Sequence, residues 1–351
     1  MNRPKHAYSF LRRMALCLSL LTGIGTAHAD NWFKQFDRWL EKGMRSGIDS
    51  SYQAVPKLMN QVYVGSYVYW QNYRMNMPLF GDNVNTIVPG IQDDDHYMIN
   101  AHSVQAEADV AIDWKGLTLE LPIPIQNKYH LALGLAKNGS VWGFRLRYKD
   151  LHQMEGDCNI GNRLINQENN SLQTFLAEGY YVFNHRKFSL AAGLYSDMIQ
   201  KRSAGSPLVY LNYFQTNYSV NKTFPANSDH FQTYQLSVGT GYAYNLALRG
   251  GKVVFHGSIV PMFTLYSHLA HQSSIDSGEN TSQWHEFYKA ADQGNARFRI
   301  NNFTRLAANY SFDRYIITFL FNHRYIGYSN DLDLHMRHFD IDAQINFCTR
   351  F

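Results

Sequence analysis

The most regular feature of this sequence is an alternation of apolar and polar side chains with a period of two residues. In the closing stretch HFDIDAQINFCTRF, the odd positions from Phe339 to Phe351 are mostly apolar and the even positions from Asp340 to Arg350 are mostly polar. Successive side chains of a strand point to opposite faces, so this spacing predicts a β-strand with one apolar and one polar face. Chains commonly end in a frayed polar tail, whereas here the alternation continues to Phe351.

The same period recurs from residue 61 onward and predicts about twelve strands, with ten to fourteen as the range. Membrane-crossing strands need roughly 9–11 residues, and every run except 116–121 is at least that long. Short turns and long connections alternate in the second half of the chain, but a long polar stretch at 150–172 falls where a short turn is expected. The predicted strands are 61–70, 103–114, 116–121, 140–149, 174–183, 187–196, 207–215, 233–248, 252–266, 297–312, 314–328 and 338–351.

The first residues have the pattern of a secretory signal. Four basic residues lie between Arg3 and Arg13, an apolar run follows, and Ala27–Ala29 forms a small-residue cleavage motif. The apolar run is too short for a membrane helix. We therefore expect residues 1–29 to be a cleaved signal peptide, residues 30–60 to form a helical and linker segment, and residues 61–351 to form the strand domain.

The segment after the predicted cleavage site has helical spacing. Asp30 or Asn31 can cap the start of this helix, and Gly43 can end it. The helix either lies on the membrane or plugs the strand domain, or it packs against the rim of that domain. Its apolar face consists of Trp32, Phe33, Phe36, Trp39 and Leu40.

Composition and charge narrow the class of protein. Of 32 Lys and Arg residues, the predicted signal holds four and no acid, so the remaining chain has 28 basic and 28 acidic residues. This balance lacks the positive surplus that a nucleic-acid partner requires. Cys158 and Cys348 are the cysteines beyond the signal, too few for a disulfide framework, and no metal-ligand spacing or cofactor motif is present.

An exported chain with alternating strands, many aromatic residues and few charges is typical of a transmembrane antiparallel β-barrel. We expect this all-β fold, with a short N-terminal helix, in the outer membrane of a Gram-negative bacterium. A barrel closes by pairing its last strand with its first, which explains a chain that ends inside a strand. The expected partners are outer-membrane lipid, lipopolysaccharide and the barrel-assembly machinery, which would read the C-terminal strand ending at Phe351; no cofactor is expected.

The stretch from Tyr180 to Phe214 resembles a family of exported proteins from Gram-negative gut bacteria, the domain-of-unknown-function family forty-four twenty-one. Its distinctive parts are VFN at 182–184, KFS at 187–189 and QKRSAGS at 200–206, while IDSSY at 48–52 and the run 133–148 sit where the family pattern expects them. The resemblance implies an outer-membrane barrel. It lends no catalytic residue, because no reaction is attached to the family.

Charged side chains are predicted to face the interior of the barrel, since they alternate with apolar residues on their strands. They either form a charged constriction that selects solutes or pair across strands and make the interior rigid. The candidates are Glu107, Asp109, Asp113, Glu120, Arg145, Arg147, Lys149, Arg299, Arg305, Arg324, Asp340 and Asp342.

Three classes of function remain open from the sequence. The first is a small channel or a barrel that binds a small ligand. The second is a membrane-embedded lipid hydrolase or acyl-modifying enzyme; His256 and Ser258 share a strand face, but no third catalytic partner lies nearby in the sequence. The third is a structural or adhesion protein that acts through its outer loops.

Deletion of Phe351 is expected to lower the yield of folded protein in the membrane, because the closing strand would lose the aromatic ring that anchors its end at the interface. The shift of the folded band on heating, measured on gels of membrane extracts, gives the folded fraction. Phe351→Tyr keeps the ring and is the control. A normal folded yield for the deletion variant would contradict the expectation.

Overall fold

The computed structural model describes residues 26–45, 47–78, 96–124, 130–160, 163–166, 170–221, 228–274, 283–289, 300–329 and 335–351. The chain divides into two compact units, residues 1–43 and 44–351. Among the described residues, no helix is long and apolar enough to cross a membrane.

Most of helix α2 (Thr26–Arg45) belongs to the first unit. The predicted helix is confirmed, but its predicted bounds are wrong, because it begins before Asp30 and continues past Gly43. Its aromatic rings lie one turn apart: Trp32 stacks on Phe36 at 5.4 Å between centroids, and Phe36 on Trp39 at 5.8 Å.

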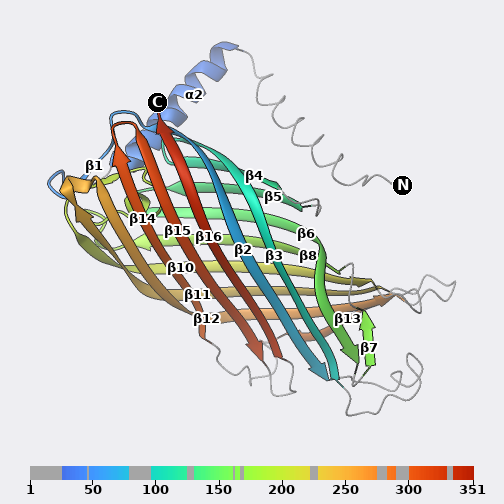
Figure 1. Ribbon diagram of the computed structural model, residues 1–351. Helices are drawn as coiled ribbons and strands as arrows, with labels where there is room; N and C mark the ends of the chain where they lie inside the picture. The colour runs from blue at the N-terminus through green and yellow to red at the C-terminus, as the bar shows by residue number, and fades with distance from the viewer. Residues whose placement is uncertain are drawn as a thin grey trace. The chain divides into compact units, whose positions relative to one another are not determined.

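The second unit is a closed antiparallel β-barrel (Figure 1). The described residues contain a sheet of 14 strands; β7 (Arg163–Asn166) pairs only with β6 and β13 (Gln283–Lys289) only with β12, so twelve strands form the ring. The ring strands are β2 (Asn60–Pro78), β3 (His96–Trp114), β4 (Leu117–Pro124), β5 (His130–Asn138), β6 (Trp142–Ile160), β8 (Asn170–Val182), β10 (Ala204–Asn221), β11 (Ser228–Leu248), β12 (Val253–Ser274), β14 (Ile300–Phe312), β15 (Tyr315–Ser329) and β16 (His335–Arg350).

The first and last ring strands close the barrel, as the terminal alternation predicted. Strand β16, red in Figure 1, pairs with blue β2 from His335↔Asn76 to Arg350↔Gln61. The Phe351 backbone N–H then donates to the Asn60 carbonyl at 3.0 Å. We call the end of the barrel that holds Asn60 and Phe351 the proximal end, and the opposite end the distal end.

Alternation places apolar side chains on the outer face of the ring strands, and most of the buried polar side chains lie on the inner face. On β16, Ile345 and Phe347 are exposed on the outer face, whereas Asp342 and Gln344 are buried inside. Large apolar side chains exposed on the outside occur on most of the ring strands, and they include Val64, Val68, Val104, Ile112, Leu121, Leu131, Trp142, Leu211, Leu246, Ile259, Leu306 and Phe319.

Two errors in the predicted strands cancel in the count. The stretch 187–196 is not a strand, although its residues alternate: Leu190–Leu194 form the short helix α4, all five residues are buried, and the Ser189 side chain caps the helix by accepting from the Ala192 N–H at 3.0 Å. Strand β5 was missed because its inward positions, Ala132, Gly134 and Ala136, are small rather than polar.

These corrections also remove the irregularity at 150–200. Strand β6 continues to Ile160, and the long connection from β8 to β10 falls at the proximal end. We call this connection, residues 183–203, the plug segment. It contains α4 and strand β9 (Ile199–Gln200), which pairs with β1 (Gln53–Ala54), just before the barrel. The remaining described element is a single 3-10 turn, η1 (Arg249–Gly251), at the proximal end.

The middle of the plug segment, residues 188–200, lies inside the barrel and shares a core with its wall. Phe188, Leu190 and Leu194 are almost fully buried and belong to one apolar cluster with inward side chains such as Met262 and Phe303. On the other side of α4, Ala191, Ala192 and Met198 pack with Met44 and Met59. Because a twelve-stranded ring encloses more space than an eight-stranded one, this segment fills room that the inward side chains alone would leave.

Candidate functional site

Charged side chains meet in the middle of the barrel interior. Arg145 on β6 donates through Nη2 to both carboxylate oxygens of Glu120 on β4, at 2.9 and 3.0 Å. Strand β5 lies between them, and its Gly134 has no side chain where a Cβ would collide with the Glu120 carboxylate. The glycine therefore gives Glu120 the space to reach a cation two strands away.

Glu178 on β8 joins opposite walls of the barrel. Its Oε2 accepts from Arg305 Nη2 on β14 at 2.9 Å, and its Oε1 from Arg324 Nη2 on β15 at 3.0 Å. Along the ring, β10, β11 and β12 separate β8 from β14, so these bonds span the lumen. Arg324 also pairs with Asp340 on β16, with 3.4 Å between Nη1 and Oδ2. Any solute that crossed the centre would have to separate these ions.

A second contact across the interior joins β6 to β16. Arg147 Nη1 lies 3.9 Å from Asp342 Oδ2, and Asn322 Nδ2 donates to Asp342 Oδ1 at 2.6 Å. Beside them, Lys149 Nζ lies over the Tyr69 ring, 4.1 Å from its centroid, a cation–π contact. We call the paired residues the central ion-pair cluster: Glu120, Arg145, Arg147, Glu178, Arg305, Arg324, Asp340 and Asp342.

The other predicted interior charges have separate positions. Glu107 accepts from the Tyr67 hydroxyl. Asp113 holds the proximal turn instead of the centre, because it accepts from the Gly116 N–H at 2.9 Å and from Thr118 Oγ1 at 2.6 Å. Arg299 lies outside the described residues, and Asp109 lines the cavity described below.

Sequence reasoning missed Glu178, which accepts from two arginines of the cluster. Its strand alternates Leu176, Glu178 and Tyr180 inside with Phe175, Ala177 and Tyr181 outside. The signal was available, since Glu178 is the acid on the inward face of a run that was correctly assigned as a strand.

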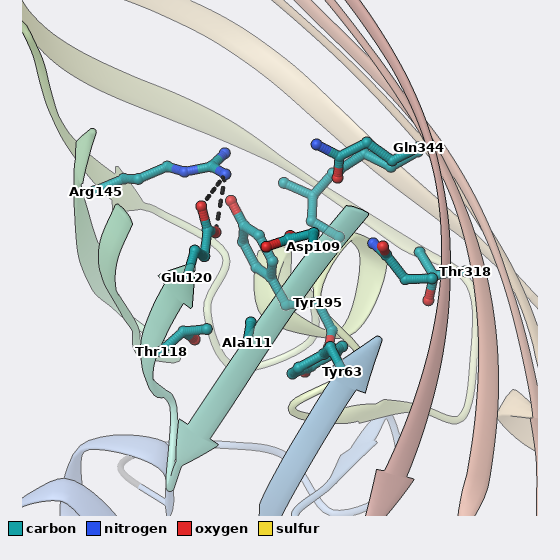
Figure 2. A pocket seen from close by; sticks show the side chains of 12 residues that line it. Tyr63, Asp109, Ala111, Thr118, Glu120, Arg145, Tyr195, Thr318 and Gln344 are labelled. Carbon is teal, nitrogen blue, oxygen red and sulfur yellow. Dashed lines mark hydrogen bonds and ion pairs between the residues drawn. The ribbon is translucent and has the colours of Figure 1, made fainter. Parts of the chain in front are cut away.

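A small cavity lies between the central cluster and the plug segment (Figure 2). Its volume is about 40 Å³, room for about three water molecules. Asp109, Glu120 and Arg145 line one part of it, and Thr318 and Gln344 line another. This cavity thus has space for solvent but none for a drug-sized ligand.

Hydrogen bonds from many ring strands hold the plug segment. Tyr63 on β2 donates its hydroxyl to the Tyr195 carbonyl at 2.6 Å, and Asn309 on β14 donates to the Gly193 carbonyl at 2.6 Å. On β11, Asn245 donates to the Ser189 carbonyl at 2.7 Å. These anchors come from well-separated parts of the ring, so the segment spans the proximal mouth.

Asp197 of the plug segment is hydrogen-bonded to three side chains of the barrel wall. It accepts from Gln61 Nε2 at 2.9 Å, from the Tyr63 hydroxyl at 3.0 Å and from Asn138 Nδ2 at 2.9 Å. Burial raises the pKa of its carboxyl well above the ordinary value, and the nearby negative charge of Asp113 adds to the shift.

The unusual stretch QKRSAGS at 200–206 forms the exit of the plug segment. Gln200 accepts from the Ser189 N–H at 3.0 Å and donates to the Lys187 carbonyl at 2.7 Å. Ser203 accepts from the Ala247 N–H at 3.0 Å, and Ser206 accepts from the Asn184 N–H at 2.9 Å. These side chains thus satisfy backbone groups that the turns leave without a strand partner.

His256 and Ser258 do share the inward face of β12, but the histidine has a packing role. Its Nδ1 lies 2.7 Å from Asn245 Oδ1, and its ring contacts Phe188 of the plug segment with 6.4 Å between centroids.

The ring, its outward apolar side chains and its filled interior define the class of protein: a closed twelve-stranded antiparallel β-barrel. More particularly, the chain belongs to the family described as Domain of unknown function (DUF4421), whose model matches residues 108–351. The match contains the stretch 180–214 that carries the resemblance, while IDSSY at 48–52 precedes it. None of the curated proteins matches the chain.

Several solved structures are similar to the chain at low identity. The outer membrane protease OmpT from Escherichia coli is 7% identical to this chain with a TM-score of 0.42. The aligned region covers 85% of this chain and 98% of the OmpT chain. The TodX monoaromatic hydrocarbon channel deltaS2 mutant is 7% identical with a TM-score of 0.23, and the aligned region covers 84% of this chain and 91% of the TodX chain. The Ralstonia pickettii toluene transporter TbuX is 8% identical with a TM-score of 0.20, and the aligned region covers 84% of this chain and 90% of the TbuX chain. These likenesses assign no activity to this chain.

Replacing Glu178 with Ala should destabilise the folded barrel by about 3 kcal/mol, because it leaves Arg305 and Arg324 buried without their shared carboxylate. Equilibrium unfolding in urea with detergent-folded protein measures the change. The control is Asp313→Asn at an exposed turn, which should shift the free energy of unfolding by no more than about 0.5 kcal/mol. Equal effects of the two substitutions would show that the pairs contribute nothing to stability.

Proposed function

We propose that this protein resides in the outer membrane of a Gram-negative bacterium, with its proximal end in the periplasm. The exposed apolar side chains on the outside of the ring support this location, because in water they would form a large unfavourable surface. The proposed partners are membrane lipid and lipopolysaccharide around the wall, and the barrel-assembly machinery at the strand that ends with Phe351. The N-terminal signal pattern supports export.

Inside that membrane the protein acts as a ligand-binding barrel rather than as a passive channel. Two layers obstruct the interior: the central ion-pair cluster and, on its proximal side, the plug segment. The observation that argues against a passive channel is the bridge from Glu178 to Arg305 and Arg324, because it joins opposite walls. The plug segment supports it as well, since Phe188 and Leu190 are fully buried in the shared core.

The wild-type protein should therefore show no steady conductance in planar bilayers, because ions would have to pass both layers. Co-flotation with liposomes confirms that the protein has inserted. A variant with residues 185–201 replaced by a short Gly–Ser link and with Glu178→Ala should conduct, which makes it the positive control. Steady unitary currents from the wild type would overturn the closed-barrel proposal.

A hydrolase is the second candidate function, and one contact favours it. Ser219 Oγ on β10 lies 2.7 Å from His230 Nδ1 on β11, and the two residues face each other across the ladder near the distal end. Both positions share the outward face with Leu211, which is exposed. A serine beside a histidine that accepts its proton is the core of serine-hydrolase chemistry, and lipid acyl chains would reach this face directly.

The hydrolase candidate predicts that a fluorophosphonate probe labels the folded protein at Ser219, because the histidine would activate the hydroxyl. Ser219→Ala should abolish the labelling, and Ser66→Ala, at an exposed serine on the outer face of β2, should leave it unchanged. Absence of labelling in the folded wild type would remove this candidate and leave the binding barrel unaffected.

A further inference from the structure

A second, larger cavity opens at the proximal rim, apart from the central ion-pair cluster. Its volume is about 200 Å³, and it lies between the plug segment and the wall formed by β12, β14 and β16. The rim turns that hold Lys252 and Asp313 line its mouth, and both residues are exposed, so the cavity can be reached from solvent. None of the cluster residues lines it.

Three polar atoms on residues that line this cavity are buried without a hydrogen-bond partner. They are Ser196 Oγ, Asn309 Oδ1 and Arg350 Nε, on residues that are 3%, 3% and 7% exposed. Other atoms of these residues are engaged: Arg350 Nη2 donates to the Ser196 carbonyl at 2.6 Å, and Asn309 Nδ2 to the Gly193 carbonyl at 2.6 Å. Their positions are therefore fixed, while one donor, one acceptor and one hydroxyl remain unmatched. Buried polar groups in native proteins nearly always have a partner, and a molecule in this cavity would bring partners close to these three residues.

The charge of Arg350 indicates the sign of that molecule. Among the described residues, no carboxylate forms an ion pair with its guanidinium. A buried charge without a counter-ion is strongly unfavourable, and an anion in the cavity would offset that cost. Lys252 adds a positive charge at the mouth and Asp313 a negative one, which favours a ligand with one negative charge over a dianion.

We propose that this cavity binds a small carboxylate that also carries a hydroxyl or ammonium donor. The carboxylate would accept from Arg350 Nε, and the donor would reach Asn309 Oδ1, with Ser196 Oγ able to act either way. A cavity of about 150 Å³ holds benzene, so this one suits a molecule of about seven or eight non-hydrogen atoms. The site deepens the proposed ligand-binding function and rests on it for its biological role, but its occupancy is measured independently of conductance.

The test uses the mature chain folded in detergent, with glycerate and L-serine as probes and glycerol as the neutral control. Ligand-observed NMR titrations give the dissociation constants, and the heat-shifted gel band confirms folding. Glycerate and serine should bind saturably, and glycerol should bind at least about tenfold more weakly, because a hydrogen bond to a charged group is lost. An adventitious weak association would instead be non-saturable and would overturn the site.

Three variants assign the binding to this cavity. Arg350→Met should weaken glycerate binding at least about tenfold, and Ser196→Ala, which removes only an oxygen without a partner, about two- to tenfold. Arg314→Met removes an exposed cation that does not line the cavity and should change nothing. Should Arg350→Met fail to fold, Ser196→Ala still decides; unchanged affinity in the folded Ser196→Ala protein would overturn the assignment. A wild-type barrel that conducts but still binds glycerate would refute the closed-barrel function and leave the proposed site intact. A barrel that does not conduct and binds neither glycerate nor serine would refute the site and leave the closed-barrel function intact.

Discussion

A ring of twelve strands has to fill the space that it encloses. Eight strands leave an interior that their own side chains occupy, whereas sixteen or more leave a water channel. This barrel lies between the two, and it fills its interior by two different means. At the centre, long charged side chains extend inward and pair; at the proximal end, the chain itself folds inward between β8 and β10. The position of nearly every polar residue discussed above follows from that requirement.

Electrostatics explains why the centre is charged rather than apolar. Lumen-facing arginines such as Arg305 and Arg324 are long enough to reach the opposite wall, and only a carboxylate there offsets their loss of hydration. Glu178 accepts from both, which fixes two strands against a third. Phe303 provides further support, because the Arg305 guanidinium lies 3.9 Å from its ring centroid. A cluster arranged in this way gives the interior one geometry instead of a set of mobile charges.

The sequence predicted the wall better than the interior. Alternation identified which face of β3, β6 and β16 points inward, because lipid-facing and interior positions differ in polarity at every step. It failed where that contrast disappears: β5 has apolar or small residues on both faces, and Phe188–Leu194 alternate although the segment is buried on all sides. The partners of the interior charges could not be predicted either, because pairs such as Arg147 and Asp342 depend on which strands face each other across the ring.

The residues that carry the family resemblance have a physical reason to be what they are. Asn184, Ser189, Gln200, Ser203 and Ser206 lie where the plug segment leaves and rejoins the wall, and their side chains accept from or donate to backbone groups there. A chain that turns inward from a sheet loses its ladder partners, and in a closed interior these groups need replacements. Polar side chains supply these replacement hydrogen-bond partners without taking up the space that Phe188 and Leu190 fill. Ser196 Oγ, in the same segment, lacks such a partner, as do Arg350 Nε and Asn309 Oδ1 on residues that line the same cavity. A molecule bound in that cavity would supply the partner that the segment itself does not.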